Sequence, residues 1–266
     1  MNIISITKEN LEKEHICCAI SNNNDCQVVA KKSWIEERLS DGLIFKKGDV
    51  RGKCFIEYIP AEKAWVPIEA DGWMYIDCLW VSGQFKGHGY SNQLLQECIN
   101  DSISQGKKGI VILSSDKKLG FLADSKYLKY KGFRLADTAQ PYFQLYYMPL
   151  TVGSSPSSHR AETNSFALPH FKPQAKNGTC PEKGFVLYYT HQCPFTAKYV
   201  PIIESIAYSG QIPFKSVLIT TAEKAQNAST PFTTYSLYYD GKFVTHEILS
   251  DKKFKKIIET VSGTNV

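Results

Sequence analysis

Two short segments of the sequence carry the residue types best suited to chemistry. In the first, residues 79–91 (LWVSGQFKGHGYS), an apolar stretch is followed by Gly87 and Gly89 and then by helical periodicity. Helix N-termini present unpaired backbone N–H groups and the positive end of a dipole, and glycines place no side chain between these groups and a phosphate. Lys86 and His88 add charge or hydrogen-bond donors. The segment therefore predicts a site for a phosphate-bearing ligand.

The second segment, residues 191–196 (HQCPFT), lies between an apolar strand pattern over 185–190 and a helical pattern over 197–208. A cysteine at a helix N-terminus is favoured as a thiolate, so we expect a lowered pKa for Cys193. Thr196 stands where a second cysteine would resolve a disulfide, which argues against a dithiol oxidoreductase. A monothiol site, a binding module and a structural relic remain open.

The composition limits the classes of protein that this chain can be. Of its 266 residues, 43% are hydrophobic and 21% charged, and its apolar runs stop well short of the ~20 residues that span a bilayer. A net charge of +5, spread along the chain, suits an anionic small molecule better than a nucleic acid. The N-terminal residues lack the pattern of a secretion signal, so we expect a cytoplasmic protein without a membrane partner. The eight scattered cysteines lack zinc-site spacing, so no metal is expected.

A change in composition divides the chain. Residues 151–182 are rich in Ser, Pro, Thr, Asn and Gly, which is typical of a linker. On both sides, short apolar strands alternate with helical patterns, which favours an α/β or α+β class. We therefore expect a first domain over residues 1–150, a linker over 151–182 and a smaller domain over 183–266.

The elements that must position the chemical residues follow from hydrophobic periodicity. In the first half we expect strands over 3–6, 43–47, 53–59, 73–81, 109–113, 133–135 and 142–148, and helices over 11–20, 26–39, 87–104 and 121–131. In the second half we expect strands over 185–190 and 214–219, a hairpin over 234–247 that turns at Asp240-Gly241, and a helix from Asp251.

Gln84, Gly87 and Gly89 match the Gln/Arg-x-x-Gly-x-Gly/Ala loop after the fourth strand of the GNAT family of N-acetyltransferases, which residues 1–150 resemble. Lys131-Gly132-Phe133 resembles the end of the GNAT helix that packs beside CoA. The resemblance implies acetyl-CoA as co-substrate. By it, backbone groups of Leu79, Trp80 and Val81 contact the pantetheine and acetyl groups, and the pyrophosphate is held by Gln84, Phe85, Lys86, Gly87, His88, Gly89, Tyr90 and Ser91.

The same resemblance implies direct attack of an amine on the thioester, which needs a base and an acid. Asp77 is the expected base, with Glu57 and Glu69 behind it, and Tyr127 is the expected acid. The chain departs from the family at Leu128, where many members have the tyrosine, and at Phe121, where many have an asparagine. Cys78 is an alternative as a covalent nucleophile.

Residues 183–262 resemble the thioredoxin-like fold, with Thr230-Pro231 where that fold keeps a cis-proline opposite the active cysteine. The resemblance implies a thiol site at Cys193 and Pro231. A GNAT domain followed by such a domain is similar to YoaP-type acetyltransferases.

Two main hypotheses of different class follow. In the first, the chain is an N-acetyltransferase acting on a small-molecule or peptide amine, and the second domain assists delivery or shapes the site. In the alternative, it is a monothiol redox or binding protein whose GNAT-like part senses acetyl-CoA without turnover. A third possibility is an adaptor in which both domains only bind partners.

Overall fold

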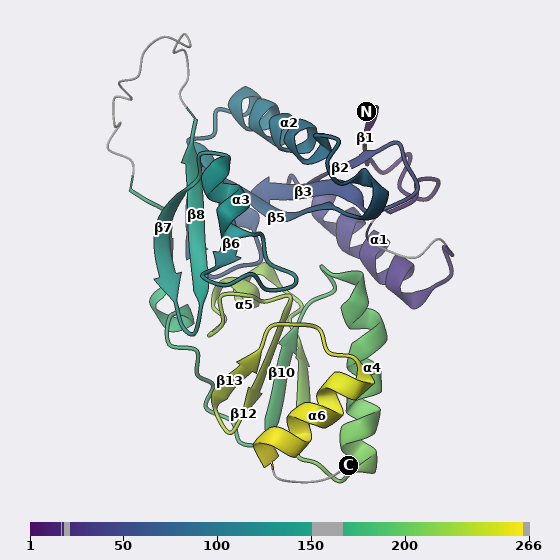
Figure 1. Ribbon diagram of the computed structural model, residues 1–266, viewed down its shortest axis with the longest axis vertical. Coiled ribbons are helices and arrows are strands. Elements are labelled where there is room, and N and C mark those ends of the chain that lie inside the picture. The colour runs from purple at the N-terminus through teal and green to yellow at the C-terminus, as the bar shows by residue number, and fades with distance from the viewer. Residues whose placement is uncertain (17, 19–21, 151–166, 263–266) are drawn as a thin grey trace.

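The computed structural model describes residues 1–16, 18, 22–150 and 167–262, and these residues build two bodies, each around its own sheet (Figure 1). The larger sheet has the strand order β1-β2-β3-β5-β6-β8-β7 and uses residues 3–149. The smaller has the order β11-β10-β12-β13 and uses residues 185–245. No helix in these described ranges is long and apolar enough to cross a membrane.

The larger sheet is covered on both faces. Its strands are β1 (Ile3–Ser5), β2 (Ile44–Gly48), β3 (Cys54–Pro60), β5 (Met74–Val81), β6 (Gly109–Ser115), β7 (Arg134–Ala139) and β8 (Phe143–Pro149). On one face α1 (Cys26–Leu39) packs into a core through Trp34 and Ile35. On the other, α2 (Tyr90–Ser104) and α3 (Ser125–Tyr130) pack through Leu94 and Leu128. Apolar side chains alternate between the two cores along the central strands, as burial on both faces requires.

The smaller sheet carries the element order that the sequence predicted. Strands β10 (Phe185–Tyr189) and β11 (Phe214–Leu218) run parallel, joined by α4 (Pro194–Ser209). Strands β12 (Tyr235–Tyr239) and β13 (Lys242–Thr245) form the expected hairpin, with Asp240 and Gly241 both at positive φ in its turn. Helix α6 (Asp251–Ser262) packs back on α4. This is a thioredoxin-like arrangement, with α5 (Ala222–Gln226) inserted before the hairpin.

Several local expectations are wrong. Over the described part of 11–20 the chain makes turns, because its i→i−4 backbone bonds stop after Glu14. The helix expected over 121–131 shrinks to α3, whose N-cap is Asp124. Part of the expected linker is structured: β9 (His170–Phe171) pairs with β4 (Ile68–Glu69) of the first body. Residues 151–166 of that linker lie outside the described residues.

Candidate active site

The glycine loop, residues 82–89, joins β5 to α2 on the surface. Gly83, Gly87 and Gly89 all have positive φ, with open space where a Cβ would stand, so it is the left-handed backbone that requires glycine there. Gly89 is the N-cap of α2 and supplies no side-chain cap, which leaves the first-turn amides of α2 without that partner. Lys86 and His88 are exposed on the loop, and the His88 ring stacks on Tyr90. The sequence-predicted phosphate site is thus an open loop with cationic or donor side chains.

Strand β5 leaves its neighbour β6 halfway along. The parallel pairing covers only Met74 to Ile76, although β5 continues to Val81 and β6 to Ser115. On the other edge of β5, Glu57 of β3 faces Cys78 while Tyr58 faces Ile76, so Asp77 is the extra residue of a β-bulge. A bulge bends its strand and re-aims a side chain. The bulge therefore marks the point where the two central strands separate, and Asp77 lies at that point.

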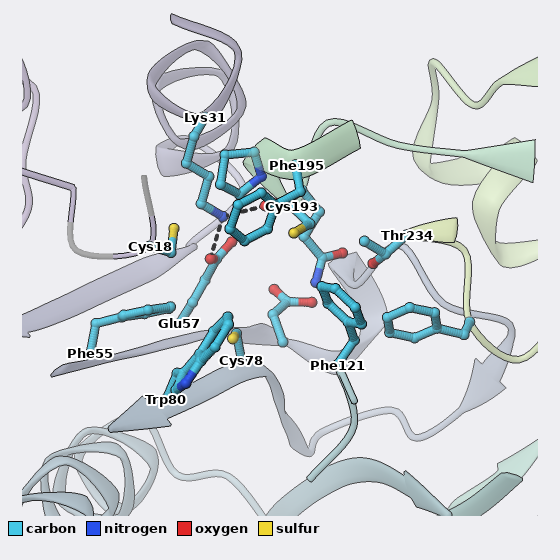
Figure 2. A pocket seen from close by; sticks show the side chains of 14 residues that line it. Cys18, Lys31, Phe55, Glu57, Cys78, Trp80, Phe121, Cys193, Phe195 and Thr234 are labelled. Atoms are coloured by element: carbon cyan, nitrogen blue, oxygen red, sulfur yellow. Dashed lines mark hydrogen bonds and ion pairs between the residues drawn. The ribbon is translucent and has the colours of Figure 1, made fainter. Parts of the chain in front are cut away.

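A partly open pocket that we call the interdomain cavity lies beside Asp77, between the two bodies (Figure 2). Its volume is about 60 Å³. The first body lines it with Cys18, Lys31, Phe55, Glu57, Asp77, Cys78, Trp80 and Phe121, and the second with Gln192, Cys193, Pro194, Phe195, Phe232 and Thr234. The N-terminus of α4 and the part of β5 that begins at the bulge thus line the same cavity.

Polar contacts hold the two bodies together around the interdomain cavity. Lys31 Nζ donates to the Gln192 carbonyl at 2.7 Å, beside the Cys193 position. His246 bridges Tyr142 Oη at 2.6 Å and the Gly120 carbonyl at 2.8 Å. Since both ring nitrogens are used by one acceptor and one hydroxyl, the buried imidazole is satisfied in its neutral form, and burial lowers its pKa. The residues joined by these contacts are more than 100 positions apart in the sequence, so distant segments of the chain meet around the cavity.

A buried ion pair forms the charged floor of the interdomain cavity. Lys31 of α1 pairs with Glu57 of β3, and both side chains are 1% exposed. Trp34 Nε1 donates to the other oxygen of Glu57 at 3.2 Å. Burial by itself would lower the pKa of Lys31, but the Glu57 carboxylate outweighs it and raises that pKa above its ordinary value. Lys31 therefore stays charged, and its charge is committed to Glu57 and Gln192.

Asp77 has a different electrostatic setting. Burial raises its pKa well above the usual range, and the neighbouring Glu57 carboxylate adds to the rise, against the opposing effect of Lys31 and Arg38. A carboxyl group with a raised pKa binds a proton more strongly than an ordinary one, so it is a better proton acceptor once ionised. The arrangement can take a proton from a group held in the interdomain cavity.

The chain is similar to known proteins, and the similarity shows its family. The chain is 41% identical to the "Uncharacterized N-acetyltransferase YoaP" of Bacillus subtilis (strain 168) over 263 residues, 98% of this chain and 100% of that protein. The family model described as YoaP-like matches residues 213–256. This chain belongs to the YoaP family. Its first half is the domain of the seven-stranded sheet, and its second half is the separate sheet domain that contains the YoaP-like region.

Solved structures are similar to the first half at low identity. A ribosomal-protein-alanine N-acetyltransferase from Brucella melitensis is 16% identical, with a TM-score of 0.41, over 56% of this chain and 100% of that one. A GNAT-family acetyltransferase from Staphylococcus aureus Mu50 is 17% identical, with a TM-score of 0.39, over 56% of this chain and 99% of that one.

Tyr127 of this YoaP-family chain does not line the interdomain cavity with Asp77. It packs on the α2 side of the sheet, where its hydroxyl is buried beside Ser91. Burial raises the pKa of Tyr127, and the nearby Ser91 hydroxyl opposes the rise. The expected acid and base thus lie on opposite faces of the sheet. Because Ser91 is in the first turn of α2, Tyr127 is next to the glycine loop.

Cys193 is the N-cap of α4, as expected, but the expected lowering of its pKa is wrong. Burial raises the pKa of the Cys193 thiol to about 11, although the Phe195 amide and Lys31 favour the thiolate. Desolvation therefore outweighs the helix N-terminus. Thr196, in the place of a resolving cysteine, is fully buried and donates to the Thr190 and Cys193 carbonyls, each at 2.8 Å. The junction between β10 and α4 therefore forms part of the cavity wall.

The structure also argues against the roles expected for Cys78, Glu69 and Pro231. Burial raises the pKa of Cys78 well above its usual range, which disfavours the thiolate that a nucleophile needs. Glu69 lies on β4, where it pairs with His170 at 3.1 Å and takes no part in the lining. Pro231 is buried next to the lining residue Phe232, and its peptide bond is not cis, since the cis bond of the described chain is Gln140–Pro141.

Sequence reasoning missed the lining residues that come from distant segments. Lys31 sits on a helix of mixed polarity, and nothing local distinguishes it from a solvated lysine. Phe195 and Phe232 come from the second domain of the YoaP-type chain, and Phe121 from a loop at positive φ. Trp80 lines the interdomain cavity, while Trp65 and Trp73 are core residues. In the described residues no cluster of His, Cys, Asp or Glu could hold a metal ion.

Proposed function

We propose that this protein transfers the acetyl group of acetyl-CoA to an amine held in the interdomain cavity, by direct attack. The observation that carries the proposal is Asp77, the bulged residue at the separation of β5 from β6. It lines the interdomain cavity, and its surroundings raise its pKa. The GNAT fold and the 41% identity to a protein named as an N-acetyltransferase support the reaction type.

In this proposal the separated strands receive the co-substrate. The backbone of Leu79, Trp80 and Val81, which β6 leaves unpaired, offers hydrogen bonds to an extended pantetheine arm. The amides and cationic groups of the residues from Gln84 to Ser91 hold the pyrophosphate. Acetyl-CoA supplies the activated thioester, whose carbonyl carbon then lies within reach of the interdomain cavity.

The two proton transfers are assigned to residues on opposite faces of the sheet. Asp77 takes the proton of the bound ammonium group, and the neutral amine nitrogen attacks the thioester carbon. The C–N bond forms and the C–S bond breaks, which leaves a thiolate on CoA, and the new amide nitrogen releases its second proton to water, from which Tyr127 is later reprotonated. Tyr127, beside the glycine loop on the α2 face, donates its hydroxyl proton to that thiolate.

The test is isothermal titration with acetyl-CoA, using the parent and a variant with Gly87→Glu and Gly89→Glu. The variant places two negative side chains where the pyrophosphate is expected, so we expect binding by the parent and none by the variant. Gly106→Glu is the matched control, because Gly106 has the same positive φ and open surroundings at the other end of α2. Absence of binding by the folded parent, or equal binding by the double variant, would contradict the proposal.

A further inference from the structure

The interdomain cavity has two chemically different ends. The end formed by the first domain carries Lys31, Glu57 and Asp77. The end formed by the second domain is mainly apolar, with Cys193, Pro194, Phe195 and Phe232. Its two polar members are Thr234 and Gln192, whose backbone carbonyl already accepts from Lys31. A ligand that fills the cavity must therefore be polar at one end and apolar at the other.

The charged end favours a cation. Lys31 is the single basic side chain in the lining, against the carboxyl groups of Glu57 and Asp77. Its charge is already matched by Glu57, and two of its three N–H donors are taken by Glu57 and the Gln192 carbonyl, so it offers a bound carboxylate no uncompensated positive charge. When Asp77 is ionised, one negative charge in excess faces the cavity. An ammonium group compensates that charge, while a carboxylate is repelled and left unpaired.

The apolar end sets a length limit. Phe195, on the first turn of α4, is half-buried between the cavity and the Lys53 side chain, whose Nζ lies 5.4 Å from its ring centre. Phe121 closes another side with a backbone φ of 66°, in a loop that the second domain holds through His246 and Glu247. A non-glycine residue at positive φ persists only where its surroundings fix it. The second domain thus shapes the cavity both directly and through the Phe121 loop.

From this asymmetry we propose that the acceptor is a small primary amine with an uncharged, apolar tail. Its ammonium group lies at Asp77 and Glu57, and its tail packs against Phe195, Phe232 and Cys193. The second domain therefore selects acceptors by their length and excludes those that carry a carboxylate at the far end. This inference rests on the proposed acetyl transfer and adds the class of its substrate.

The test compares rates of CoA release with matched amines. Isopentylamine and β-alanine have the same shape, with an isopropyl end in one and a carboxylate in the other. We expect kcat/KM for β-alanine to be lower by at least about 100-fold, because a buried polar end without a partner is rejected strongly. Hexylamine and octylamine then probe the length limit, and we expect octylamine to be a poor acceptor for the parent.

Phe195→Ala enlarges the apolar end and should raise the ratio of kcat/KM for octylamine to kcat/KM for isopentylamine by about 10-fold or more. Tyr208→Ala is the matched control, since Tyr208 is on the same helix but 88% exposed. Unchanged length preference in Phe195→Ala, or β-alanine as good as isopentylamine, would overturn the inference. So would binding of acetyl-CoA without acetylation of any amine, a result that leaves the co-substrate site standing. Failure to bind acetyl-CoA would overturn the proposed function and this inference together.

Discussion

The chain turns from a strand into a long helix twice around its proposed site, and the two junctions differ in almost every physical respect. Between β5 and α2 the glycine loop is exposed and takes its conformation from residues at positive φ. Between β10 and α4 the junction contains no glycine and places Cys193 and Pro194 against the interdomain cavity. The first can receive an anion from solvent, while the second faces a lysine that is already paired.

The difference teaches that a helix N-terminus does not by itself create reactivity. Both junctions offer the same partial positive charge. At the second, loss of water costs a thiolate more than the helix returns, so the pKa of Cys193 rises to about 11. Exposure and backbone freedom, which the glycine loop has, decide which of the two junctions can bind a charged ligand.

The largest effect should separate co-substrate binding at the glycine loop from the chemistry in the interdomain cavity. Asp77→Asn removes the proposed base without changing the size of the side chain. We expect kcat to fall by about 10²- to 10⁴-fold, with the affinity for acetyl-CoA unchanged. Because burial raises the pKa of Asp77, the parent should gain activity as pH rises through that raised pKa, and the variant should lose this dependence. Steady-state kinetics across pH measures both. The exposed Asp71→Asn is the control, and full activity in Asp77→Asn would place the base elsewhere.

Next in size is the effect of breaking the closed junction. Lys31→Met leaves the Glu57 carboxylate buried without its ion-pair partner and removes the bond to Gln192, so the free energy of unfolding should fall by about 3–5 kcal/mol. Lys215→Met removes a surface pair with Glu182, in which Lys215 is 59% exposed, and should cost at most about 1 kcal/mol. Urea unfolding of both variants measures the difference. Equal losses would mean that the pair does not hold the cavity together.

A smaller change tests whether the open junction depends on backbone freedom. A methyl group at Gly89 meets open space, so Gly89→Ala costs only the strain of a left-handed residue, about 1–2 kcal/mol. We expect acetyl-CoA to bind about 10-fold more weakly, and Gly89→Asn to bind better than Gly89→Ala because asparagine tolerates this conformation. Titration calorimetry provides the affinities. If Asn proves no better than Ala, strain is not the reason for glycine here.

The smallest effect concerns the thiol of the closed junction. Only the thiolate is alkylated, so a pKa of about 11 makes the reaction of Cys193 with iodoacetamide slow at neutral pH. Below pH 11 the rate should rise about tenfold for each unit by which the pH is raised. Peptide mass spectrometry should find Cys193 unmodified under conditions that label the exposed Cys26. Rapid labelling of Cys193 at neutral pH would revive a monothiol function.

What could be predicted from the sequence was local. The helix after Gly89, the strand that carries Asp77 and the hairpin turn at Asp240-Gly241 each follow from residues close in sequence. The acidity of Cys193 was predicted wrongly because the cavity that buries it is completed by residues such as Lys31 and Glu57, far away in sequence. The bulge at Asp77 was missed for a related reason, since it exists only relative to the partner strand β3.

The connection that follows β9 is short, and this affects how the two domains stay together. The first domain holds the chain as far as Lys176, whose carbonyl accepts from the Gln140 amide, and the second takes it up at Thr179, which bridges to Lys242. Only Asn177 and Gly178 separate these points. So short a tether gives each domain an effective concentration at its partner of about millimolar or more. Even a weak interface then stays closed, so the protein can keep its cavity intact while leaving the contacts around it polar.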